Sequence, residues 1–169
     1  MTDIDIEKFY EEVKENKFLE GYQKQYKSAN KDAKSNLLSC GKLSRGAKND
    51  FENNNLTRAS ENFGRATASL LTVLQDLEEL QKQRNQVLPI DLKNLIFSGV
   101  YTKDHVLSNL WWYGVALKLY EDAFKLRADP KSMFENRFIR VAKKTTLEKD
   151  FRKFIQQGLE EFERGYNSV

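Results

Sequence analysis

The feature that most constrains this chain is an apolar seam through residues 56–87. Positions alternately three and four apart along it are Leu56, Ala59, Phe63, Ala66, Leu70, Val73, Leu77, Leu80, Arg84 and Val87. All except Arg84 are apolar, which is typical of one face of a long helix that other helices must cover. The sequence therefore predicts an all-α protein, folded as an antiparallel bundle or coiled coil of three to four long helices.

Caps and breaks divide the 169 residues into expected helices. We expect a single domain, residues 1–169, because this length can bury one core. Its predicted helices span residues 4–45, 55–97, 103–128 and 131–165. Residues 48–55 are polar and should form a short connection, which favours antiparallel packing of the first two helices.

Local signals support these boundaries. Asn54 or Asn55 can cap the second helix, and Pro89 should kink it. Thr102 is a candidate cap for the third helix. Asp129 followed by Pro130 is a typical helix start. A capping-box pattern at residues 145–148 indicates that the last segment divides near residue 143.

The residues that usually carry chemistry are scarce. Cys40 and His105 are the only cysteine and the only histidine, so a zinc site built on several such ligands is excluded and only one base could serve a nucleophile. No nucleotide-binding glycine motif occurs. We therefore expect no enzyme, no cofactor and no metal.

Basic residues form two blocks. In residues 21–48 the only acid is Asp32, although an exposed helix face usually mixes charges. The second block lies in residues 131–153, and the two would merge if the first and last helices were neighbours. The candidate binding residues are Lys24, Lys27, Lys31, Lys34, Lys42, Arg45, Arg137, Arg140, Lys143 and Lys144. They could instead pair with the acidic segments 1–20 and 49–80 inside the fold.

Three consecutive aromatic residues are a candidate interface. Trp111 and Trp112 should point about 100° apart on a helix, so one can pack inward while the other contacts a second helix or a partner chain. Tyr113 completes this predicted interface.

Residues 63–125 resemble a BAR domain. The resemblance rests on Leu70, Val73, Leu77, Leu80, Arg84, Pro89 and Leu92, followed by the aromatic repeat from Trp112 through Tyr120 to Phe124. It implies a homodimeric antiparallel three-helix coiled coil that binds curved anionic membrane through basic residues without catalysis. The helices are short for such a dimer and residues 98–104 indicate a break, so a compact bundle is the alternative.

We therefore predict a non-enzymatic helical scaffold that self-associates or docks in a larger assembly and presents its basic face to anionic membrane. The first alternative is a compact four-helix adaptor or complex subunit that binds an acidic protein, and the second is a nucleic-acid-binding helical protein. No window resembles a membrane span and the first residues lack an apolar leader. We expect a cytoplasmic protein, free or peripheral at a membrane.

Overall fold

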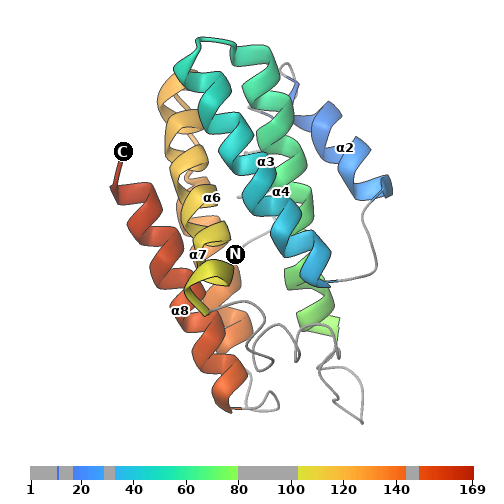
Figure 1. The fold of residues 1–169 in the computed structure, drawn as a ribbon, viewed down its shortest axis with the longest axis vertical. Helices are drawn as coiled ribbons and strands as arrows, with labels where there is room; N and C mark the ends of the chain where they lie inside the picture. The colour runs from blue at the N-terminus through green and yellow to red at the C-terminus, as the bar shows by residue number, and fades with distance from the viewer. Residues whose placement is uncertain (1–10, 12–16, 29–32, 80–102, 144–148) are drawn as a thin grey trace.

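The computed structural model describes residues 11, 17–28, 33–79, 103–143 and 149–169, and within them it is all-helical (Figure 1). The helices are α2 (Phe18–Ser28), α3 (Ala33–Glu52), α4 (Leu56–Glu79), α6 (Lys103–Phe124), α7 (Pro130–Ala142) and α8 (Lys149–Asn167). No strand occurs in these described ranges, so the all-α prediction is confirmed for them.

Helices α3 and α4 form a hairpin. Asn54 adopts a left-handed backbone conformation with φ of 58°, which asparagine tolerates well. Asn55 caps α4, since its Oδ1 accepts a hydrogen bond from Arg58 N at 3.4 Å. Helix α3 continues seven residues beyond the predicted end at residue 45. Phe51 explains the extension, because it packs edge-on against Tyr120 of α6, with ring centroids 6.4 Å apart.

The first predicted helix, residues 4–45, is wrong as a single helix. Its described part contains two helices, α2 and α3, and both pack against α4. Helix α2 crosses α4 at a contact between backbones: a Cβ added to Gly21 would lie 2.1 Å from the carbonyl oxygen of Glu61. Phe18 anchors the crossing from the buried side, where its ring packs at a tilt against Phe63 and Tyr120. Its apolar ring has to reach the core, which a continuation of α3 would not allow.

Neighbouring helices run in both relative directions. The α3–α4 hairpin is antiparallel as predicted (Figure 1). Helices α3 and α6 instead run in the same direction, because Gly41 lies against Asn109 and Phe51 against Tyr120. Helices α6 and α8 are also parallel, as Figure 1 shows. An apolar stripe carries no information about helix direction, so the antiparallel prediction was wrong for these two pairs.

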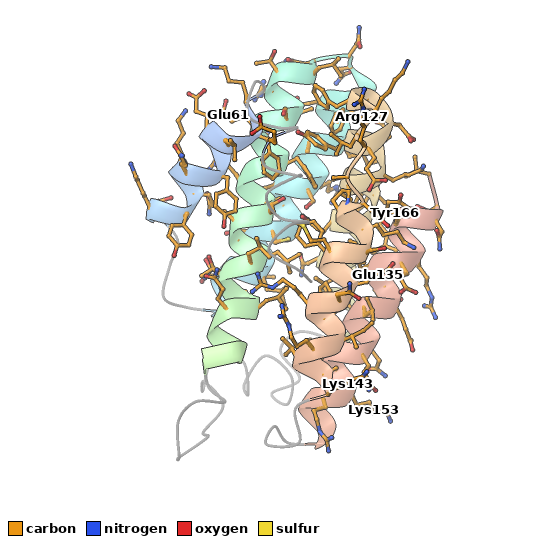
Figure 2. The ribbon with its side chains drawn as sticks, turned by 180° about the vertical axis from the view of Figure 1, so that it is seen from behind. Glu61, Arg127, Glu135, Lys143, Lys153 and Tyr166 are labelled. Atoms are coloured by element: carbon orange, nitrogen blue, oxygen red, sulfur yellow. The ribbon has the colours of Figure 1, made fainter. Side chains whose placement is uncertain are left out.

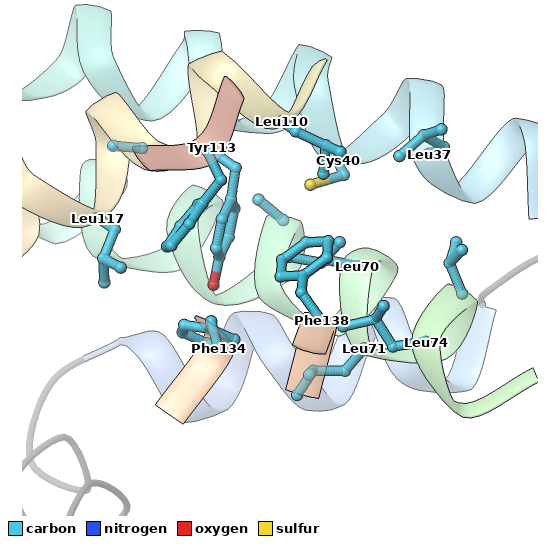
Figure 3. Packing of buried hydrophobic residues seen from close by; sticks show 14 of the residues in the cluster. Leu37, Cys40, Leu70, Leu71, Leu74, Leu110, Tyr113, Leu117, Phe134 and Phe138 are labelled. Atoms are coloured by element: carbon cyan, nitrogen blue, oxygen red, sulfur yellow. The ribbon is translucent and has the colours of Figure 1, made fainter. Parts of the chain in front are cut away.

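Helix α4 lies at the centre of the core (Figure 3) and contacts α2, α3, α6 and α7. Its predicted seam is buried from Ala59 to Val73, whereas Leu56 remains 38% exposed. Leu71 and Leu74, outside the seam, are buried as well, because α4 has neighbours on several sides. The side chains of Leu77, Leu80, Arg84 and Val87 and the predicted kink at Pro89 lie outside the described residues.

The start of α7 follows the predicted cap. Asp129 Oδ1 accepts a hydrogen bond from Ser132 N at 3.1 Å, and Pro130 occupies the first turn. Helix α6 ends at Phe124 rather than residue 128, since Lys125 turns into the left-handed region with φ of 48°. The predicted division of the last segment is confirmed by the separate helices α7 and α8. Thr102 and residues 144–148, with the candidate capping box, lie outside the described part.

Candidate functional site

The lysines predicted to form a stripe on the first helix are separated. Lys24 lies on α2, where its Nζ is 3.4 Å from Glu20 and 3.2 Å from Glu61 of α4. Hydrogen bonding and attraction from Glu61, with a further contribution from Glu20, raise the pKa of Lys24. Lys27 is exposed on the same helix. Lys31 and the side chain of Lys34 lie outside the described residues, so only Lys24 and Lys27 represent this half of the stripe.

Two basic residues of α3 stand beside α6. Lys42 and Arg45 are exposed, and neither has a carboxylate partner among the described residues. Lys48, one turn further along, pairs with Glu52 at 2.8 Å. The predicted charge on α3 is therefore available at Lys42 and Arg45, while that of Lys48 is shared with an acid.

The second basic block gathers at one end of α7 and α8. Arg140, Lys143 and Lys153 are exposed, and Figure 2 shows Lys143 and Lys153 at the same end of this helix pair. Ile139, next to Arg140 on α7, is exposed at 37%. We call these four residues the basic tip. Lys144 lies outside the described residues.

Arg137 does not belong to the exposed surface that the sequence predicted. Its side chain is buried, with 8% exposed. Phe134 and Val141, three residues before it and four residues after it on the same helix, are buried and share its face, and the adjacent Phe138 is buried too. That spacing was visible in the sequence and could have identified Arg137 as an inward position.

The two basic blocks do not merge. Helix α3 packs on α4 and α6, whereas α7 packs on α8 and α4. Figures 1 and 2 show α3 and α7 on opposite sides of the molecule. Lys42 and Arg45 therefore belong to one surface and the basic tip to another.

The aromatic triplet splits between surface and core. Tyr113 is fully buried, and its hydroxyl hydrogen-bonds Thr67 at 2.9 Å. Tyr113 is therefore a core residue, and its prediction as a partner contact is corrected. Trp111 and Trp112 are both partly buried, with their rings edge-to-face at 4.7 Å. The indole of Trp112 faces α3, where Arg45 Cζ lies 5.2 Å and Lys48 Nζ lies 5.5 Å from the ring centroid.

A hollow of about 400 Å³ opens between α3 and α6 beside Trp112. Lys42, Arg45 and Asn49 line it from α3, and Ser108, Asn109 and Trp112 line it from α6. Gly41 and Gly46 complete the α3 wall. We call this site the α3–α6 hollow. Sequence reasoning missed Asn49, Ser108 and Asn109, because they enter the site only through the register of two helices that are far apart in the chain.

Two further features bear on possible reactive or metal-binding groups among the described residues. Cys40 is buried, and burial raises the pKa of its thiol to about 12. Within the described ranges, no group of three or more His, Cys, Asp or Glu is placed to hold a metal ion. The helices described here include none that is long and apolar enough to span a membrane. Comparisons with protein-family models, with curated proteins and with solved structures gave no match.

Proposed function

We propose that this chain is a non-enzymatic helical scaffold that docks on anionic membrane through its basic tip. The observation that carries the proposal is the exposure of Arg140, Lys143 and Lys153 at the end of the helix pair that also exposes Ile139. Ile139 and Lys143 are four residues apart on α7 and therefore share a face. An apolar side chain among cations suits the boundary between lipid headgroups and acyl chains.

The size of the expected attraction argues for more than one copy at the membrane. A basic residue near an anionic surface contributes about 1 kcal/mol, so three contribute about 3 kcal/mol. Stable anchoring usually needs two signals, and self-association would supply a second basic tip in the same particle. The proposal therefore includes self-association, which is also what the resemblance to BAR domains implies.

Vesicle co-sedimentation tests the proposal. Vesicles of phosphatidylcholine with phosphatidylserine, prepared at several diameters, should pellet the protein, and vesicles of phosphatidylcholine alone should not. The double variant K143E/K153E should lower the membrane partition coefficient by at least about tenfold, because each reversal replaces attraction with repulsion. Light scattering after gel filtration gives the solution mass, for which we expect a dimer or larger assembly.

The variant K27E is the control for reversing a lysine elsewhere, and it is compared with K143E and K153E made singly, since Lys27 is an exposed lysine on α2, away from the basic tip. It should retain membrane binding. Equal pelleting of the double variant and the unmodified protein would remove the basic tip from the proposal. A monomer that is indifferent to lipid charge would refute the membrane function altogether.

A further inference from the structure

The α3–α6 hollow is a second site that the membrane proposal does not use. It is wide enough, at about 400 Å³, to admit side chains of another molecule. A Cβ on Gly46 would meet only Asn62 Nδ2 of α4, at 3.8 Å, which is an ordinary contact. Gly41, in contrast, is needed for Asn109 to lie against α3, because a Cβ there would be 1.9 Å from Asn109 Oδ1.

The charges of the hollow select an anionic ligand. Lys42 and Arg45 contribute two cations, and no described carboxylate pairs with either. Arg45 lies over the Trp112 ring with Cζ 5.2 Å from its centroid. A guanidinium that stacks on an indole keeps its N–H donors at the rim, where they can bind a carboxylate in bidentate geometry.

The same contacts disfavour a nucleobase or a lone small anion. Arg45 and Lys48 both lie near the indole that a base would need for stacking. An exposed ion pair contributes less than about 1 kcal/mol, so a single free anion would bind weakly. A ligand of useful affinity must therefore make several contacts along the hollow. Asn49, whose amide can both donate and accept, lies one helical turn beyond Arg45 and suits a peptide backbone.

We propose that the α3–α6 hollow binds an acidic segment of a protein partner. One carboxylate of the segment pairs with Arg45 and a second approaches Lys42, and beyond Arg45 the segment continues past Asn49 and the edge of Trp112. The hollow and the basic tip lie on different helices, so the scaffold would hold a protein on one surface and membrane on another. This proposal stands independently of the membrane function.

The test uses a synthetic Glu-rich peptide and a matched peptide in which each Glu is replaced by Gln. In a W111F background Trp112 is the only tryptophan, so its fluorescence reports on the hollow. The Glu peptide should change this fluorescence in a saturable manner, and the Gln peptide should not. R45Q should weaken binding of the Glu peptide by about three- to fivefold, measured by calorimetry or by anisotropy of a labelled peptide.

Two controls separate the hollow from general charge effects. K27Q and K153Q remove the same charge at exposed positions on α2 and in the basic tip, and both should retain peptide affinity. N49E should weaken binding of the Glu peptide because it adds a negative charge to the wall of the hollow, and circular dichroism with a thermal melt verifies that it folds. Equal affinities of R45Q and K27Q, or equal binding of the Gln peptide, would overturn the proposal.

Vesicles distinguish a lipid from a protein at this site. One outcome is that the Glu peptide binds neither the unmodified protein nor R45Q, while R45Q loses the binding to phosphatidylserine vesicles that the unmodified protein has. The hollow would then be a lipid site and this proposal would be wrong. If K143E/K153E abolished vesicle binding and left peptide binding intact, both proposals would be supported separately.

Discussion

The hydroxyl of Tyr166 donates a hydrogen bond to Oε2 of Glu121 and so joins the last turns of α8 to α6 (Figure 2). Two lysines flank the tyrosine ring: Lys118 Nζ lies 5.5 Å and Lys131 Nζ lies 5.1 Å from its centroid. The contact connects three helices, because Lys131 belongs to α7. It therefore holds together the end of the molecule opposite the basic tip.

Removing this hydroxyl should destabilise the protein. The variant Y166F leaves the partly buried Glu121 carboxylate without its donor, which should lower the free energy of unfolding by about 1–3 kcal/mol. Urea denaturation followed by circular dichroism measures the change. The control is Y26F, since Tyr26 is 53% exposed and its hydroxyl should contribute almost nothing. A loss in Y26F as large as that in Y166F would contradict this account.

Glu121 should also make the free energy of unfolding fall as the pH rises. Burial raises the pKa of Glu121, and this outweighs the opposing effect of the Tyr166 hydrogen bond. The folded state therefore holds the proton more tightly than the unfolded state, so the stabilisation is complete below the unfolded pKa of 4.5 and is lost as pH rises through the raised folded pKa. The variant E121Q lacks this titration. The unfolding free energy of E121Q minus that of the unmodified protein should thus rise with pH and then level off. A difference that falls with pH would mean that folding lowers the pKa of Glu121.

The contact between α6 and α8 should tolerate no side chain at Gly114. A Cβ there would lie 2.1 Å from the carbonyl oxygen of Phe162 and 2.8 Å from Tyr166 N, both backbone atoms. G114A should therefore lose about 1–3 kcal/mol of stability, because the two helices must separate. G46A is the matched control. Its new methyl group has room, and replacing glycine within a helix should add about 0.5–1 kcal/mol.

Local signals in the sequence predicted the parts of the fold that depend on neighbouring residues. The seam of α4 from Ala59 to Val73 and the Asp129 cap of α7 were recognisable because each is encoded by residues of a single helix and its cap. The separation of α2 from α3 was not recognisable in this way, because it depends on contacts of Phe18 with Phe63 and Tyr120, which are far away in the sequence. Helix direction was equally hidden, because the glycine contacts that specify it join residues such as Gly114 and Phe162 that are far apart in sequence.

The candidate site shows the same limit. Lys42, Arg45 and Trp112 were predicted as binding residues from charge and aromatic pattern, but nothing in their spacing indicated that they share one hollow. Arg137 was predicted to lie on the surface because it is charged. Its position in the sequence of α7 indicated the opposite, because Phe134, Phe138 and Val141 around it are buried. Position on the helix was the better guide there.

The buried Cys40 thiol offers a test of how tightly the core is closed around it. Burial raises its pKa to about 12, and the thiolate is the form that reacts with alkylating reagents. At mildly alkaline pH the folded protein should thus react with iodoacetamide at least about a thousandfold more slowly than the protein in guanidinium chloride, because reaction requires opening of the structure. If that opening is global unfolding, the logarithm of the labelling rate should rise in G114A in proportion to its loss of stability, whereas G46A should not label faster. Native labelling within tenfold of the denatured rate would show that the helices around Cys40 separate locally, and the core contacts described for α3, α4 and α6 would need revision.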